Sequence, residues 1–236
     1  MTGTYKRDDL TIDQHLALAT AARRLGEEFT GLFGTETIER FLHTSYDQFA
    51  GKAAVANFLP LLAERFARQR LYALARVEGR SDGRPIVLFL CVHNAGRSQM
   101  ALGFFEHLAG EHAVAWSGGS EFASEVNPAA IAVMAEVGID ISKGFPKPWT
   151  EEIVRAADVV VTMGCGDACP IFPGKRYEDW KLDDPMGKDP EWVRPIRDEI
   201  EHRVRTLLAD LGVPVPGSAP DLAPDFAPPP APGLRH

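Results

Sequence analysis

Cysteine is scarce in this chain. Of 236 residues only three are Cys, and an odd number argues against a framework of structural disulfides. Long apolar runs are absent as well, since no stretch approaches the ~20 apolar residues needed to cross a bilayer. The start of the chain is polar and charged, without the apolar core of a signal peptide. These absences predict a cytoplasmic protein with no membrane segment, in which the few thiols serve redox or catalytic chemistry.

Positively charged residues are fewer than negatively charged ones. The chain carries 25 Lys and Arg residues against 33 Asp and Glu residues, a formal net charge of -8 at pH 7. Such an acidic chain is not expected to bind nucleic acid. If it binds an anion, it must create positive potential locally, with backbone amides and a few well-placed arginines.

Three regions of the chain differ in composition. Residues 1–80 carry apolar side chains at helical spacing, and they predict a small three-helix bundle. Residues 213–236 are dominated by Pro, Ala and Gly, and they predict a disordered tail, because they bury too little apolar surface to offset the entropy of ordering. A Gly-rich, charged linker, Glu78–Pro85, leads into the region between them, residues 81–212.

In this middle region, predicted strands alternate with predicted helices. Ile86–Leu90 is a continuous apolar run, as expected of a strand buried on both faces. The other candidate strands are Val114–Trp116 and Asp158–Thr162, and the candidate helices are Ser98–Leu108, a helix opened by Pro128, and Glu191–Leu211. The alternation predicts an α/β fold, with a parallel sheet and helices on both of its faces.

The loop after the first strand is the strongest candidate site. It joins the carboxyl end of a buried strand to a helix, the position where open α/β sheets bind ligands. Its backbone amides can form a nest for a tetrahedral anion, and Arg97 can add paired hydrogen bonds to two anion oxygens. The residues expected to bind the oxyanion are Val92, His93, Asn94, Ala95, Gly96, Arg97 and Ser98.

Cys91 opens this loop, and we expect it to be a catalytic nucleophile. Helix N-termini and nearby cations favour the thiolate, which is the reactive form of cysteine. Ser98 can donate a hydrogen bond to the sulfur, while Asn94 tolerates left-handed backbone geometry and can pin the loop. For His93 we expect a structural or steering role rather than that of a base. The alternative is that Cys91 is a buried core cysteine at a strand end.

The other two thiols, Cys165 and Cys169, follow the third candidate strand. On a helix, residues four apart rise about 6 Å, near the upper limit of Cα separation for a disulfide. Gly164, Gly166 and Pro170 make the segment a poor helix that is easily remodelled, which suits a redox pair. The alternatives are a pair of buried thiols or half of a metal site.

Asp184, directly before Pro185, is the candidate general acid, with Asp183 in reserve. An oxygen that leaves an oxyanion as oxide is prohibitively unstable, so a proton donor is needed. The alternative is that these three residues simply form a turn.

A series of short motifs runs through the middle region: Cys91–Ala101, Ser117–Gly119, Val126–Pro128, Asp140–Ser142, Val161–Met163, Cys165, Cys169–Pro170, Trp180 and Asp183–Pro185. In this order they resemble arsenate reductases built on the low-molecular-weight tyrosine phosphatase fold. The resemblance extends from about Ile86 to Leu211. It implies a four-stranded parallel sheet flanked by helices, and reduction of arsenate to arsenite for arsenic detoxification. It also favours Asp184 as the acid.

The resemblance further implies a relay of three thiols. Cys91 attacks arsenate, Cys165 attacks the Cys91 sulfur and releases arsenite, and Cys169 moves the disulfide to Cys165–Cys169. Thioredoxin or a low-molecular-weight thiol would reduce that disulfide, so no bound cofactor and no metal are expected. Phosphate and sulfate are expected to bind as analogues of arsenate.

Some features depart from relatives or leave other functions open. Reductases that bind a monovalent cation near the loop use a Glu where this chain has Leu102, so Lys147 is hypothesised to supply positive charge instead. One alternative function is a low-molecular-weight protein tyrosine phosphatase, although the aromatic residues that usually follow its Asp-Pro pair are replaced by Met186-Gly187-Lys188. The other is a non-enzymatic arsenite or redox sensor. Helical extensions accompany some such reductases, and here the helices would dock a partner, mediate dimerisation or shield the redox segment.

Overall fold

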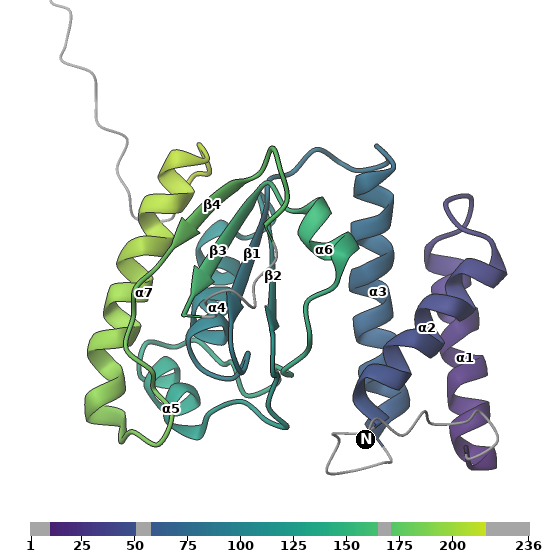
Figure 1. The fold of residues 1–236 in the computed structure, drawn as a ribbon, viewed down its shortest axis with the longest axis horizontal. Coiled ribbons are helices and arrows are strands. Elements are labelled where there is room, and N and C mark those ends of the chain that lie inside the picture. The colour runs from purple at the N-terminus through teal and green to yellow at the C-terminus, as the bar shows by residue number, and fades with distance from the viewer. Residues whose placement is uncertain (1–9, 51–57, 165–170, 216–236) are drawn as a thin grey trace, which may run out of the picture.

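The chain folds into a four-stranded sheet with helices on both sides and further helices at its N-terminal end (Figure 1). The structure is a computed structural model that describes residues 10–50, 58–164 and 171–215. In chain order its elements are α1 (Ile12–Glu28), α2 (Thr35–Ala50), α3 (Leu59–Val77), β1 (Ile86–Cys91), α4 (Arg97–Ala109), β2 (Val114–Gly119), α5 (Pro128–Glu136), α6 (Glu151–Ala156), β3 (Val159–Met163), β4 (Arg176–Asp179) and α7 (Pro190–Asp210).

All four strands are parallel, in the order β2-β1-β3-β4, which confirms the predicted α/β fold class. β1 is central, and its Leu88 lies opposite Trp116 of β2 and Val160 of β3. Every residue of β1 is buried, as its continuous apolar sequence predicts. β4 is a polar edge strand without an apolar pattern, so only the resemblance predicted a fourth strand.

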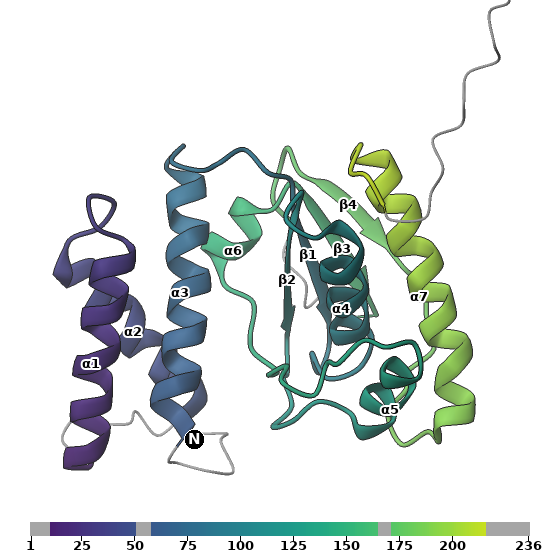
Figure 2. The same cartoon turned by 180° about the vertical axis from the view of Figure 1, so that it is seen from behind.

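Different helices cover the two faces of the sheet (Figures 1 and 2). α4, α5 and α7 form one buried cluster with the face that carries Phe89 and Val161. α6 and the N-terminal helices form a second cluster with the opposite face, which carries Leu88 and Leu90. Cys91 belongs to the first cluster, at the carboxyl end of the central strand.

The three predicted N-terminal helices are confirmed as α1, α2 and α3, but they have no core of their own. Their apolar residues share one buried cluster with the sheet and with α6. α3 packs along α6, and Arg76 of α3 pairs with Asp158 at 3.0 Å. The rings of Phe49 and Phe122 meet edge to face at 5.7 Å between centroids. The helices therefore form an outer layer over one face of the sheet domain.

The structure differs from the sequence-based predictions in one domain boundary and one short helix. Val213, assigned to the disordered tail, is buried in the cluster of α4, α5 and α7, and its N–H donates to Leu208 O at 2.9 Å. The packed domain therefore extends beyond residue 212, while residues 216–236 lie outside the described residues. The short helix α6 was not predicted, because six residues are too few to display a helical period.

Candidate active site

The loop between β1 and α4 surrounds the sulfur of Cys91. Only 2% of Cys91 is exposed. The backbone N–H of Asn94 donates to Sγ at 3.2 Å, and Ser98 Oγ lies 3.0 Å from the same sulfur. Both contacts can stabilise negative charge on the sulfur, which a nucleophilic thiol requires.

Asn94 fixes this loop from within. Its φ of 49° lies in the left-handed region, which Asn tolerates better than most residues. Its side-chain Nδ2 donates to Ser98 Oγ at 2.8 Å, and its Oδ1 accepts from the backbone N–H of Lys147 at 3.0 Å and from Gln99 Nε2 at 3.2 Å. These contacts are the pinning bonds expected of Asn94, and they tie the loop to a segment that is distant in sequence.

Arg97 and Asp184 come together beside the loop, although they lie 87 residues apart. Arg97 Nη2 is 2.6 Å from Asp184 Oδ2, and Arg97 Nη1 donates to Leu182 O at 3.3 Å. The other oxygen of Asp184 accepts from the N–H of Met186 at 3.0 Å. The Arg97 side chain is only 8% exposed, whereas that of Asp184 is 47% exposed. The guanidinium is thus held at the loop, while the carboxyl group keeps access to solvent protons.

Cys91, Arg97 and Asp184 line one cavity of about 210 Å³. Its other walls are His93, Ala95, Gly96, Ala123, Glu125, Val126, Asn127, Pro128, Pro185 and Met186. A Cβ added to Gly96 would lie 2.5 Å from Pro185 Cγ, so only glycine allows the Asp184–Pro185 segment to close this tightly on the loop. The predicted nucleophile, cation and acid therefore face one small cavity.

Asn127 joins the loop to the acid segment, a role that the sequence analysis missed. Its N–H donates to Ala95 O at 2.9 Å, and its Nδ2 donates to Pro185 O at 3.2 Å. Its Oδ1 caps α5 by accepting from the N–H of Ala129 at 2.8 Å. Asn before Pro at a helix start is a recognisable capping signal, but the two long-range bonds leave no local pattern.

Lys147 is buried directly behind the loop. Its Nζ lies 3.3 Å from Ser117 Oγ and 4.5 Å from the centroid of the Phe145 ring. Burial, together with the positive charge of Arg65, lowers the pKa of Lys147 to about 8. Leu102 packs against the apolar cluster of α4, α5 and α7. The backbone N–H of Lys147 donates to Asn94 of the loop, whereas its ammonium lies against Ser117 and Phe145. With a pKa of about 8, part of the positive charge hypothesised for Lys147 is lost at mildly alkaline pH.

The remaining predicted site residues are His93, Asp183 and the two other cysteines. His93 Nδ1 lies 3.1 Å from Glu121 O, a contact that suits the expected structural role. Asp183 is exposed. Cys165 and Cys169 lie outside the described residues. Gly164, which precedes them, lies against Arg97, because a Cβ there would meet Arg97 Nη1 at 2.9 Å. Gly164, the last described residue before the two cysteines, therefore lies beside Arg97 at the cavity.

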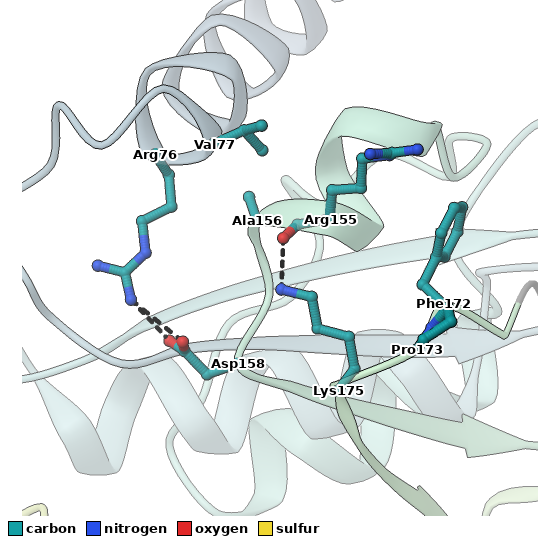
Figure 3. Close-up of a pocket in the computed structure, with 8 residues that line it drawn as sticks. All are labelled: Arg76, Val77, Arg155, Ala156, Asp158, Phe172, Pro173 and Lys175. Carbon is teal, nitrogen blue, oxygen red and sulfur yellow. Dashed lines mark hydrogen bonds and ion pairs between the residues drawn. The ribbon is translucent and has the colours of Figure 1, made fainter.

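A second cavity, of about 440 Å³, lies at the opposite, amino ends of the strands (Figure 3). Three cations line it, and each already has a partner. Arg76 pairs with Asp158, Arg155 pairs with Glu151 at 2.7 Å, and Lys175 donates to Ala157 O at 2.8 Å. The Arg76–Asp158 pair joins α3 to the start of β3, the Lys175 bond joins the end of α6 to the chain before β4, and the Arg155–Glu151 pair lies within α6. Cys91 is not among the residues that line this cavity.

Neither a metal centre nor a membrane span is found in the part of the chain that the structure describes. No group of three or more His, Cys, Asp or Glu residues is arranged there to hold a metal ion. Likewise, none of the described helices combines the length and the apolarity that crossing a bilayer requires.

Comparisons with known protein families match both parts of the chain. Residues 18–75 match a family described as protein-tyrosine-phosphatase-like, N-terminal domain. Residues 86–215 match the low molecular weight phosphotyrosine protein phosphatases.

Individual relatives are similar at the level of sequence and structure. Arsenate reductase 2 of Staphylococcus epidermidis is 41% identical over 127 residues, which cover 52% of this chain and 95% of that protein. Glutaredoxin arsenate reductase of Synechocystis is 40% identical over 128 residues, which cover 53% of this chain and 97% of that protein. The solved structure of a thioredoxin-dependent arsenate reductase of Corynebacterium glutamicum has a TM-score of 0.74 and 44% identity, and the match covers 83% of this chain and 96% of that one.

Proposed function

Because the chain belongs to the low molecular weight phosphotyrosine protein phosphatase family, we propose that it reduces arsenate to arsenite with the thiol of Cys91. One observation carries the proposal: the cavity beside Cys91 also holds Arg97 and Asp184, paired at 2.6 Å. A nucleophile, a cation and a proton donor are then within reach of one bound anion. The similarity to the Corynebacterium glutamicum arsenate reductase, at 44% identity, supports arsenate as that anion.

In the proposed first step, a bond forms between sulfur and arsenic. The Cys91 thiolate attacks arsenate while the amides of the loop from Val92 to Ser98, together with Arg97, bind the other oxygens. Asp184 gives a proton to the departing oxygen, which leaves as water. Exposed Asp183 is the reserve donor. Arsenic remains pentavalent in this step, attached to Cys91 through sulfur.

Reduction takes place in the second step. Cys165 attacks the Cys91 sulfur, a disulfide forms, and the electron pair of the sulfur–arsenic bond stays on arsenic, which departs as trivalent arsenite. Cys169 then attacks Cys165, so that the disulfide moves to Cys165–Cys169 and Cys91 returns as a thiolate. The net change converts one arsenate and two thiols into one arsenite, one disulfide and water.

The electrons come from an external thiol, and we propose thioredoxin as its source. The solved relative from Corynebacterium glutamicum is thioredoxin-dependent, whereas the Synechocystis relative is a glutaredoxin arsenate reductase. A low-molecular-weight thiol is therefore the alternative donor. Both kinds of donor are kept reduced in the cytoplasm, so the proposal includes that compartment.

Turnover with defined electron donors tests the proposal. The full chain is supplied with arsenate and with NADPH-driven thioredoxin, or with glutathione and glutaredoxin, and hydrolysis of an aryl phosphate is measured in parallel. We expect arsenate-dependent NADPH oxidation with thioredoxin and none in Cys91→Ser. Aryl-phosphate hydrolysis without arsenate reduction by any donor would instead identify a phosphatase, and absence of both activities would favour a sensor.

The relay has its own test. Cys169→Ser is expected to release about one arsenite per chain and then stop, because the disulfide cannot leave Cys91. Arsenite is measured after rapid mixing, with Cys91→Ser as the control that releases none. Sustained thioredoxin-driven turnover by Cys169→Ser would contradict the relay.

A further inference from the structure

Residues 143–149, here called the supporting segment, contact the anion-binding loop directly at Lys147 and indirectly, through Gln99 of α4, at Gly144. The backbone N–H of Lys147 donates to Asn94 Oδ1 at 3.0 Å. Gly144 lies against Gln99, since a Cβ at Gly144 would come 2.7 Å from Gln99 Oε1, and Gln99 Nε2 donates to Asn94 O at 3.0 Å. The position of Asn94, whose N–H contacts the Cys91 sulfur, therefore depends on the supporting segment.

The N-terminal helices hold the same segment from its other side. Arg65 of α3 donates through Nη1 and Nη2 to Lys143 O at 3.2 and 3.3 Å. Its Cζ lies 4.3 Å from the centroid of the Phe145 ring, and Phe49 of α2 lies 6.2 Å from that ring. The chain that leads into α6 runs between the sheet and α3 in both views (Figures 1 and 2).

Phe145 lies within reach of two cations. The Lys147 ammonium lies 4.5 Å from the ring centroid and Arg65 lies 4.3 Å from it. Each cation is attracted to the electron-rich face of the ring, so the contacts fix Phe145 relative both to α3 and to the residue that bonds Asn94. A continuous path of contacts thus joins Arg65, on the surface of α3, to the loop around Cys91.

We propose that Arg65 is a positioning residue, which acts through Phe145 and the supporting segment to hold the loop around Cys91 in its anion-binding geometry. The inference rests on the proposed function, because it assumes that this loop binds the oxyanion. A nest of backbone amides binds well only when its N–H groups are already aimed at the anion, so slight loosening of the loop weakens binding. The N-terminal helices would then contribute to catalysis without touching the substrate.

Arg65→Gln tests the proposal in the full chain. The variant removes the cation over Phe145 from an exposed position, where the substitution should not prevent folding. Calorimetric titration with inorganic phosphate should give a dissociation constant raised about fivefold, as expected if part of the energy of the cation–π contact and of the two hydrogen bonds to Lys143 O is used to hold the loop. With arsenate, KM should rise by a similar factor while kcat changes little, because the reacting groups remain. Arg65→Lys, which keeps a cation, should recover part of the affinity.

Arg68→Gln is the matched control on the same helix. Arg68 pairs with Glu28 at 2.7 Å and with Glu64 at 3.1 Å, both within the N-terminal helices. We expect it to lower the melting temperature but to leave phosphate binding unchanged. Equal losses of phosphate affinity in the two variants, or unchanged affinity in Arg65→Gln, would overturn the proposal. If the wild type binds phosphate but reduces no arsenate, the proposed function fails while this role of Arg65 is still decided by the titrations.

Discussion

Replacing Asn94 by alanine should destabilise the chain measurably, because its side chain satisfies groups that have no access to water. Asn94 is fully buried. Alanine at this position leaves the Lys147 N–H without its acceptor at 3.0 Å, whereas Gln99 retains a second acceptor at Asn94 O. One buried orphan donor costs about 1–3 kcal/mol. Alanine must also adopt the left-handed φ of 49°, at about 1 kcal/mol more. The expected loss is therefore about 2–4 kcal/mol.

Glycine at the same position separates the two contributions. Asn94→Gly loses the same hydrogen bonds but adopts a positive φ readily, so it should be about 1 kcal/mol more stable than Asn94→Ala. Both variants should bind phosphate more weakly than the wild type, because the loop loses its direct hydrogen bond to the supporting segment and keeps only the contact through Gln99.

Denaturant unfolding at equilibrium, with phosphate titration alongside, measures these effects. The variants should share the m-value of the wild type, so that midpoints report stability directly. The reasoning would be refuted if Asn94→Ala lost less than about 1 kcal/mol, or if Asn94→Gly were the less stable variant.

Three further perturbations have predictable results. Gly96→Ala places a Cβ 2.5 Å from Pro185 Cγ and must displace the acid segment, so single-turnover arsenite formation should slow about 10- to 100-fold, and an unchanged rate would contradict this. Folding lowers the pKa of Lys147 from 10.5 to about 8, through burial and Arg65, with Glu106 opposing. The unfolded chain then binds more protons in that window, so the free energy of unfolding should rise with pH from about 8 to 10.5, and Lys147→Met should lose this rise. Potassium should leave the melting temperature unchanged, and a rise would count against Lys147 as the local positive charge.

The part of the site that could be predicted is the part that is contiguous in sequence. The segment from Cys91 to Ser98 contains Asn94 and lies between a strand and a helix that adjoin it in the sequence. Local rules therefore suffice to predict an anion-binding loop. The Arg97–Asp184 pair spans 87 residues, and only the resemblance to a family connected the two. The contacts of Asn127 and Lys147 could not be predicted, because hydrogen bonds between distant segments leave no periodic pattern in the sequence.

The fold was predictable to a similar degree. β1 is apolar throughout, which indicates that both of its faces are buried. It does not indicate which helices pack against each face. The amphipathic N-terminal helices predicted a small three-helix bundle but not its contacts with the sheet, since periodicity shows that a helix has an apolar face and not what that face contacts. β4 and α6 are respectively too polar and too short for a periodic signal.

The shared core argues against treating the N-terminal helices as a removable module. The Staphylococcus epidermidis reductase is matched over 95% of its length by 127 residues, which cover only 52% of this chain, so deletion of the residues before Gly83 is an obvious experiment. In this chain, however, the deletion removes Phe49 from Phe122 and α3 from α6, where Ile153 is only 1% exposed. The uncovered apolar surface should bind a hydrophobic dye and promote aggregation. A monomeric truncated chain with the full-length melting temperature and no dye binding would contradict this. Because truncation would disturb the whole face of the sheet, point substitutions such as Arg65→Gln are the cleaner way to ask what these helices do for the loop.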